Sequence, residues 1–338
     1  MTASQATSTR PAVFFVAGFG DQIMSLPAMR ALSGIFPGGF QLFLGEGMLS
    51  FFYQDLTISS ITRAWYADVR KRRIDVDRIL PRALPCDTFV ALSPWTSPSV
   101  LDLASRLGAR RTVGHLGAVD ERVTHAEDAH MFDLLFAVAA TLRPQLQFEA
   151  FAYPPRFSAA AEAAALRFVR AHVQPGQRIL FVHPETHTDK MWSAAAMSWV
   201  LQRFLDDHPD YVVFVASVGW YPLALTRHWD RIVLLDEHLE LLMAAMRYAD
   251  LFLGVDSCFL HAADLFRVPG VGLFGPTAPQ RWGFRLSPHG RSVWGRGSMH
   301  AIAREDVLEA LRACARAARA DGVPQAAPAD AAANAAWS

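Results

Sequence analysis

The sequence predicts an α/β protein of two domains, each built on a parallel sheet with helices on its faces. Short runs of β-branched and aromatic residues alternate along the chain with stretches whose apolar residues recur at helical spacing, which is the pattern of such a fold. This alternation runs from residue 12 to 142 and again from residue 179 to 318. The 338 residues of the chain are also too many for one ordinary hydrophobic core.

The first series opens with the apolar run AVFFV at 12–16, which has no helical period and predicts a buried parallel strand. A glycine turn follows from Gly18 to Asp21, and apolar residues then recur at helical spacing from Ile23 to Leu32. This succession of strand, turn and helix is typical of the start of a doubly wound domain. The same patterns predict strands at 41–44, 88–92 and 112–115, and helices at 48–54, 99–107 and 129–142.

The second series follows a proline-rich segment, 143–157, which has little periodicity and which we interpret as the linker. We therefore place the two domains at 11–155 and 156–320. The tail 321–338 is rich in Ala and Pro and is expected to be disordered. The patterns predict strands at 179–182, 211–216, 232–235, 251–255 and 271–274, and helices at 159–172, 195–205, 239–248, 259–265 and 307–318.

Composition excludes several classes of protein. Lys plus Arg equals Asp plus Glu at 32 each, so the basic excess of a nucleic-acid-binding protein is missing. The three cysteines, Cys86, Cys258 and Cys314, are far apart and support neither a disulfide framework nor a zinc site. No stretch reaches the roughly 18 apolar residues of a membrane span, and no signal-peptide core is present. These features predict a cytoplasmic protein.

Asp21 lies at or near the start of the first predicted helix, and two explanations fit it. Its carboxylate would cap the free N–H groups of the helix, or it would act as a general base at the end of a strand. The helix dipole would keep it ionised in either case. The surrounding segment GFGDQ is neither a GxGxxG fingerprint nor a Walker A loop.

A second polar segment, HPETHTDKMW at 183–192, follows a predicted strand directly. Its hydroxyl groups and its lysine are suited to holding phosphate oxygens. The alternative is a polar loop with a solvated lysine. The proline at 184 argues against a helix, so His183 and His187 are not expected to form a metal pair.

A third segment, GVDSCFLH at 254–261, crosses from a predicted strand into a helix. Ser257 is placed to cap this helix, whose first free N–H groups would form an anion site at the end of the strand. His261, one turn later, would reach the same anion as a donor. The alternative is a capped helix that contains a partly buried histidine.

Taken in order, the three segments resemble the heptosyltransferases, which are ADP-heptose-dependent, inverting glycosyltransferases of the lipopolysaccharide-core type. GDQIMSLPAMRAL at 20–32 resembles the opening of the family, and HPETHTDKMW resembles its HPG…KxW segment. The most specific match is GVDSCFLHAADLFRVPGVGLFGPTAPQRWG at 254–283. The resemblance implies a GT-B fold, in which two Rossmann-like α/β/α domains face a central cleft.

The resemblance also implies roles for individual residues. Asp21 matches the base that deprotonates the acceptor hydroxyl, and Lys190 matches the lysine on the phosphates of the donor. The remaining donor-site positions that the resemblance implies are Thr186, Thr188, Asp256, Ser257, Cys258 and His261. The reaction would be an inverting displacement at the anomeric carbon, with a nucleoside diphosphate as leaving group, and it would require no metal or other cofactor.

The sequence departs from the family at several positions around the donor. Cys258 stands where the family usually has glycine, and Glu185 replaces the glycine of HPG. The acidic residue that the family carries near the nucleoside is missing after the strand 211–216. Trp220 or Tyr221 would stack on the base instead. These departures bear on the identity of the sugar and the nucleotide more than on sugar transfer itself.

The acceptor is expected to meet the first domain. Arg70, Arg72 and Arg73 belong to the densest basic run of the chain, and Arg122 is a second choice. A solvated surface loop is the alternative explanation of the run. The acceptor itself would be a glycan, a protein or a small molecule, and a lipid-linked acceptor would bring peripheral membrane contact with it.

Two alternatives stay open beside a transferase that uses ADP-heptose. One is a GT-B enzyme of another kind, either a transferase for a different sugar or a nucleotide-sugar epimerase. The other is a relative that binds nucleotide sugars or glycans without turnover. The joint presence of Asp21, Lys190 and His261 favours an enzyme, because a protein without catalysis has no chemical need for all three.

Overall fold

The computed structural model describes residues 10–94, 97–115, 118–124, 126, 128–217 and 221–320. The chain forms two compact units, Met1–Tyr153 and Pro154–Ser338. The division lies inside the segment 143–157 that we interpret as the linker. The tail 321–338, for which we predict disorder, lies outside the described residues.

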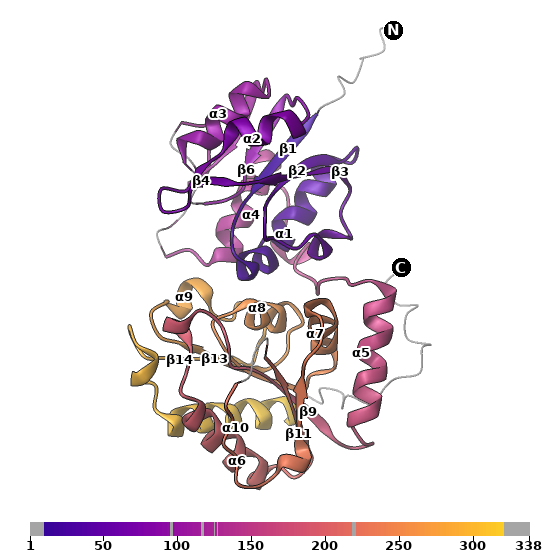
Figure 1. Ribbon diagram of the computed structural model, residues 1–338, viewed down its shortest axis with the longest axis vertical. Helices are drawn as coiled ribbons and strands as arrows, with labels where there is room; N and C mark the ends of the chain where they lie inside the picture. Colours follow the sequence, from indigo (N-terminus) through magenta and orange to yellow (C-terminus); the bar gives the residue numbers. More distant parts are fainter. Residues whose placement is uncertain are drawn as a thin grey trace. The chain divides into compact units, whose positions relative to one another are not determined.

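The first unit is built on a six-stranded sheet in the order β3-β2-β1-β6-β7-β8, of which Figure 1 labels β1, β2, β3 and β6. Neighbouring strands are parallel throughout this sheet. After β3 the chain adds a small antiparallel hairpin, formed by β4 and β5. The strands are β1 (Pro11–Phe15), β2 (Phe40–Gly45), β3 (Ile58–Ala64), β4 (Tyr66–Asp68), β5 (Arg73–Ile74), β6 (Thr88–Ala91), β7 (Arg111–Gly114) and β8 (Glu121–Arg122).

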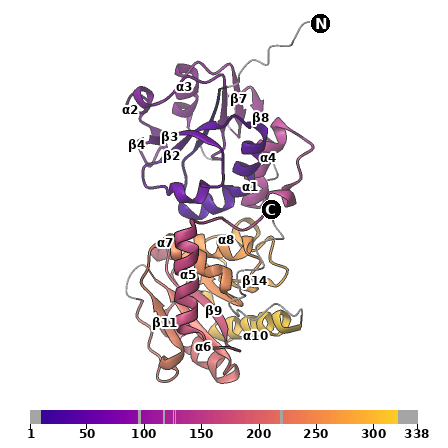
Figure 2. The same cartoon turned by 90° about the vertical axis from the view of Figure 1, so that its right-hand side faces the viewer.

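Helices cover both faces of this first sheet, with α2 and α3 on one side and α1 and α4 on the other (Figure 2). Phe14, Phe43 and Phe89 come from three adjacent strands and lie on the same face, with ring centroids 6.2 Å apart in each pair. They belong to the apolar core under α2 and α3. The helices are α1 (Phe19–Ile35), α2 (Val76–Ile79), α3 (Pro98–Arg106) and α4 (Met131–Leu142), with 3-10 turns η1 (Ser50–Tyr53), η2 (Leu80–Arg82) and η3 (Phe148–Ala150).

The second unit repeats this plan. Its sheet has six strands in the order β11-β10-β9-β12-β13-β14, again with parallel neighbours. The strands are β9 (Arg178–His183), β10 (Tyr211–Ala216), β11 (Ile232–Leu235), β12 (Leu251–Val255), β13 (Gly270–Phe274) and β14 (Gly290–Trp294).

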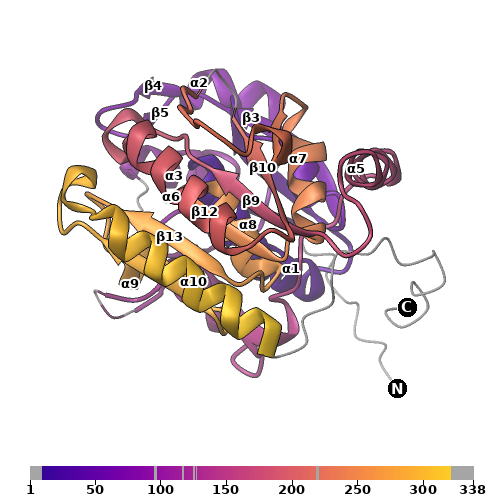
Figure 3. The ribbon, with the colours of Figure 1, turned by 90° about the horizontal axis from the view of Figure 1, so that it is seen from below.

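The faces of the second sheet are assigned by the alternation of side chains along a strand. Leu180 and Val182 of β9 enter the core formed with α6 and α10, which lie together on one face (Figure 3). Phe181, between them, points to the other face and stacks on Phe259 of α8, with ring centroids 5.6 Å apart. The helices are α5 (Ala159–His172), α6 (Ala194–Asp207), α7 (Leu239–Ala245), α8 (Cys258–Leu265), α9 (Pro279–Trp282) and α10 (Arg304–Ala320), with 3-10 turns η4 (Thr188–Lys190), η5 (Trp229–Arg231), η6 (Met246–Tyr248) and η7 (Met299–Ala301).

Both sheets therefore have the doubly wound strand order 3-2-1-4-5-6, counted within each unit. In such sheets ligands bind beyond the carboxyl ends of the strands, at the point where the order reverses. That point lies between β1 and β6 in the first unit and between β9 and β12 in the second. The predicted α/β class is confirmed, whereas the helix predicted at 48–54 is only the 3-10 turn η1.

Among the residues that the structure describes, no helix combines the length and the apolar character that crossing a bilayer requires.

Candidate active site

Two loops of the second unit meet at its switch point. One follows β9 and carries the segment His183 to Lys190, and the other leads from β12 into α8. The two strands are paired directly, with Gly254 opposite His183. A Cβ atom at Gly254 would lie 2.5 Å from the Phe252 ring and 2.9 Å from the His183 carbonyl oxygen. Glycine at this position therefore lets the ends of the two strands approach closely.

Asp256 is the centre of a polar cluster in these loops. Its Oδ2 accepts hydrogen bonds from Lys190 Nζ at 2.8 Å and from the Thr277 hydroxyl at 2.7 Å. Its Oδ1 lies 3.7 Å from His261 Nε2. The side chain of Asp256 is 4% exposed and that of Lys190 28%, and Thr277 is half-buried, so solvent reaches the cluster from the side of Lys190 and Thr277. Lys190 of the segment 183–192 is thus brought together with Asp256 and His261 of the segment 254–261.

Thr277 is the member of this cluster that the residue patterns did not single out. It lies in the loop after β13, within the segment 254–283 that resembles the family most closely. A resemblance that names a motif does not say which of its residues share a carboxylate. The hydroxyl is recognised as a site residue only through its contact with Asp256.

Ser257 occupies the N-cap position of α8, with φ −154° and ψ 174°, but its side chain accepts no capping hydrogen bond. The predicted position is therefore right, whereas the predicted side-chain cap is wrong. Its Oγ is buried and has no hydrogen-bond partner within the described part of the chain. The first N–H groups of a helix have no partner inside the helix, so they and this hydroxyl are available to an anion.

Cys258, the first residue of α8, is partly exposed. Burial raises the pKa of its thiol to about 12. The thiol therefore stays protonated at neutral pH. Because the thiolate is the reactive form of cysteine, Cys258 is no candidate nucleophile.

The far end of α8 is held by a buried carboxylate. Asp264 is fully buried, and it accepts the backbone N–H groups of Arg285, Leu286 and Ser287 at 2.9, 2.8 and 2.8 Å. These three bonds tie the loop after α9 to the helix whose first turn carries Ser257. Asp264 therefore supports the position of α8, at whose start Ser257 lies.

The remaining polar residues of the first loop are divided between the interior and the surface. His183 is buried beside Phe259, and burial lowers the pKa of its imidazole to about 4. Its neutral ring donates from Nδ1 to the Ala216 carbonyl at 2.7 Å. His187 is exposed and bonds Asp189, so the two histidines have separate partners. Two hydroxyl-bearing residues of this loop, half-buried Thr186 and exposed Thr188, precede Lys190.

The suggestion that Tyr221 stacks on a nucleotide base is wrong. The side chain is 7% exposed and belongs to the core under α6 and α10, and its hydroxyl donates to the Trp192 carbonyl at 3.1 Å. Trp220, the other residue suggested for this role, lies outside the described residues.

In the first unit, Asp21 is the third residue of α1, directly after the turn that follows β1. Its Oδ2 accepts the backbone N–H of Gly18 at 3.0 Å. A contribution to the helix start is therefore present, as one of the two explanations of this residue expects. The same bond holds a carboxylate at the carboxyl end of the first strand, where the doubly wound fold places ligands.

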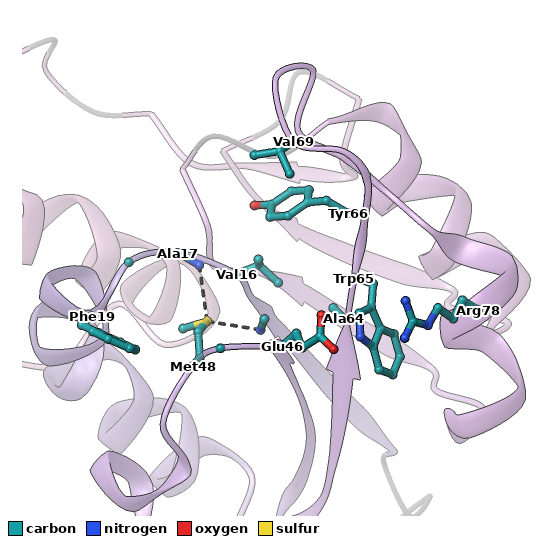
Figure 4. Close-up of a pocket in the computed structure, with 13 residues that line it drawn as sticks. Val16, Ala17, Phe19, Glu46, Met48, Ala64, Trp65, Tyr66, Val69 and Arg78 are labelled. Carbon is teal, nitrogen blue, oxygen red and sulfur yellow. Dashed lines mark hydrogen bonds between the residues drawn. The ribbon is translucent and has the colours of Figure 1, made fainter. Parts of the chain in front are cut away.

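A cavity of about 510 Å³ lies beside this turn, at the carboxyl ends of β1, β2 and β3 (Figure 4). Gly18 and Phe19 line it, so the segment that carries Asp21 forms part of its wall. The Met48 sulfur accepts the backbone N–H groups of Ala17 at 3.4 Å and Gly45 at 3.2 Å, which fixes the floor of the cavity. The lining residues are Val16, Ala17, Gly18, Phe19, Gly45, Glu46, Gly47, Met48, Ala64, Trp65, Tyr66, Val69 and Arg78.

The basic residues proposed for the acceptor do not converge on one place. Arg70, Arg72 and Arg73 are exposed on the β4–β5 hairpin, which follows β3. Arg122 is exposed in β8, at the opposite edge of the sheet. None of the four lines the cavity. The aromatic residues that do line it, such as Trp65 and Tyr66, carry no motif and were not predicted.

Comparison with known proteins identifies the fold. The family model for glycosyltransferase family 9 (heptosyltransferase) matches residues 105–311, more than half of the chain. A family 9 glycosyltransferase from Veillonella parvula superimposes with a TM-score of 0.67 at 16% identity, over 90% of this chain and 97% of that one. No curated protein matches the sequence significantly.

Two structures from E. coli are also similar. The ADP-heptose lipopolysaccharide heptosyltransferase II gives a TM-score of 0.64 at 14% identity, over 92% of this chain and 99% of that one. The heptosyltransferase WaaC with ADP gives 0.62 at 15% identity, over 91% and 99%. Both have the two-sheet GT-B fold. This chain therefore belongs to glycosyltransferase family 9, the heptosyltransferase family, and is a glycosyltransferase with the GT-B fold.

Proposed function

We propose that this chain is an inverting glycosyltransferase that moves a heptose or a related sugar from a nucleoside diphosphate, ADP-heptose in the first place, to a hydroxyl acceptor. The observation that carries the donor side is the cluster of Lys190, Thr277 and His261 around Asp256, beside the start of α8. A cation, hydroxyl groups and free helix N–H groups at one switch point are the groups that bind a pyrophosphate.

The composition of the chain supports the assignment of Lys190. Only two of its 32 basic residues are lysines, Lys71 and Lys190, and the others are arginines. In a chain that uses arginine almost everywhere, one of the two lysines places its compact ammonium group 2.8 Å from the buried carboxylate of Asp256. An ammonium group suits phosphate binding as a point charge, whereas the planar guanidinium group imposes a fixed geometry.

In the proposed reaction each unit supplies one part of the chemistry. Asp21 accepts the proton of the acceptor hydroxyl, whose oxygen then forms a bond to the anomeric carbon of the donor. The bond from that carbon to the phosphate oxygen breaks, and its electron pair leaves with the nucleoside diphosphate. Lys190 and the N–H groups at the start of α8 stabilise the charge that develops on this leaving group.

The role of the donor site is tested first by nucleotide binding. We expect ADP and ADP-heptose to raise the melting temperature of the protein by a few degrees, since a ligand at about 100 times its Kd adds about 2.7 kcal/mol of stability. GDP, UDP, CMP and dTDP serve as the comparison set. A selective response to one of those would keep sugar transfer and change the donor. No response to any nucleotide would contradict the proposal and favour a relative that does not turn over.

Replacement of Lys190 by alanine should weaken ADP binding by about 10- to 100-fold, because a charge-assisted bond to phosphate is lost. Isothermal titration calorimetry with ADP measures this change. Lys71→Ala is the matched control, since it removes the other lysine, which is exposed on the β4–β5 hairpin. Unchanged affinity in Lys190→Ala would remove this residue from the phosphate site.

A further inference from the structure

The cavity of the first unit differs in chemistry from a site for an anionic group. Its walls are largely apolar, with Phe19, Trp65 and Tyr66 as aromatic members (Figure 4). Its volume of about 510 Å³ lies within the range of roughly 300–1,000 Å³ that small-molecule sites occupy. Such sites combine apolar walls with a few polar groups that orient the ligand.

The cations at the cavity are engaged by the protein itself. The guanidinium group of Arg78 lies over the Trp65 ring, 4.1 Å from its centroid. Arg63, on the neighbouring strand β3, donates to the carbonyl oxygens of Gly45 and Met48 at 3.3 and 2.6 Å. The basic run of the hairpin does not contribute to the lining. A phosphate in this cavity would therefore meet one lining cation, Arg78, which is stacked on Trp65, and one lining carboxylate, that of Glu46.

The charge of Arg78 is balanced in this lining by a carboxylate. Glu46 follows β2, lines the cavity and is exposed to solvent. Tyr66 adds a phenol that stays protonated, because burial raises its pKa. A carboxylate accepts hydrogen bonds from hydroxyl groups and repels phosphates and other carboxylates. The aromatic rings of the wall favour a ligand that can pack a flat apolar face against them.

A neutral sugar ring has an apolar face and hydrogen-bond donors, since one of its faces exposes C–H groups and its edge carries hydroxyl groups. We propose that this cavity holds the acceptor as a neutral sugar ring, whose C–H face lies on Trp65 and Tyr66 and whose hydroxyl groups donate to Glu46. That the ring is the acceptor rests on the proposed function, because Gly18, which bonds Asp21, forms part of the same wall. The binding of the ring itself is independent of it.

Fluorine NMR on protein labelled with 5-fluorotryptophan tests the proposal without any transfer reaction. The probes are the methyl glycosides of glucose, galactose and mannose, with mannose 6-phosphate as the charged comparison. The sequence contains 9 tryptophans, and the Trp65→Phe variant identifies the resonance of Trp65. We expect at least one neutral glycoside to shift this resonance with a Kd of about 1 mM or weaker, as small ligands usually show. The resonance of Trp229, an exposed tryptophan in the second unit, should not move.

Two variants test the contacts separately. Glu46→Gln should weaken glycoside binding by about tenfold, because the hydrogen bonds lose their charge. Tyr66→Ala should weaken it by a similar factor of about ten, through loss of the ring. The proposal is overturned if no neutral glycoside moves the Trp65 resonance, if both variants bind as the wild type does, or if mannose 6-phosphate binds more tightly than methyl mannoside.

Calorimetry with ADP on the same samples separates this inference from the proposed function. Binding of ADP without any glycoside effect on Trp65 would overturn the neutral-ring site and leave the donor proposal standing. A glycoside effect without ADP binding would do the reverse, and the cavity would then be a sugar site in a protein with another role.

Discussion

Replacement of Asp21 by asparagine should reduce the turnover number by about 10²- to 10⁴-fold, because general base catalysis contributes on that scale. The amide oxygen of asparagine still accepts the Gly18 N–H bond, which Asp21 accepts at 3.0 Å. The start of α1 is therefore preserved while the base is removed. Transfer from ADP-heptose to the acceptor measures turnover, and calorimetry with ADP should show unchanged affinity.

Asp87→Asn is the matched control for this change. Asp87 also accepts a backbone N–H group through Oδ2, that of Arg10 at 2.8 Å. It lies just before β6, at the amino end of the same sheet, where no substrate is expected. Full turnover in Asp87→Asn and lost turnover in Asp21→Asn would assign the base. Equal turnover in both would show that Asp21 serves the helix start alone.

Replacement of Asp264 by alanine should lower the free energy of unfolding by about 3–5 kcal/mol, the scale on which the loss of one partner from a buried charged network acts. Three backbone N–H groups, those of Arg285, Leu286 and Ser287, lose their acceptor together. Urea unfolding with tryptophan fluorescence and circular dichroism measures the change.

Two comparisons show whether the lost acceptor is the cause of this destabilisation. Asp264→Asn retains one oxygen for the two N–H groups that bond Oδ1. It should therefore lower the free energy of unfolding by less than Asp264→Ala does. Asp236→Ala, at an exposed position after β11, should change stability by less than about 0.5 kcal/mol. If Asp264→Ala were as stable as Asp236→Ala, the three bonds would not hold the loop after α9.

The central strands could be predicted from the sequence because they are buried on both faces. Such strands, β1 and β12 among them, appear as continuous apolar runs bounded by turns. Three of the four edge strands, β3, β8 and β14, were missed for the opposite reason, whereas the edge strand β11 was predicted at 232–235. In β3, Ile58–Ala64, pairs of polar residues interrupt the apolar ones and only two of the seven residues are buried. In β14, Gly290–Trp294, Val293 and Trp294 are the only large apolar side chains.

The two loops proposed to bind the donor could be singled out in the sequence because each follows a predicted strand and carries a local motif. Contacts between separate loops, such as that of Thr277 with Asp256, could not be predicted from sequence separation alone. The cavity of the first unit was beyond prediction for a stronger reason. Trp65 and Tyr66 show neither a helical period nor a motif, and they become wall residues only when β1, β2 and β3 lie side by side. The basic run that contains Arg70, Arg72 and Arg73 was proposed for the acceptor instead, because a cluster of charged residues can be recognised from the sequence alone.

The repeated strand order of the two units bears on how a glycosyltransferase of this kind diversifies. Each unit has its own sheet and its own apolar core, and each carries its functional loops at its own carboxyl edge. With the donor and acceptor sites as proposed, a change around Glu46 or Trp65 would alter which molecule receives the sugar without disturbing the residues around Asp256. Donor and acceptor choice would then be separate inheritable traits, and new pairings between them would arise through mutations confined to one half of the gene.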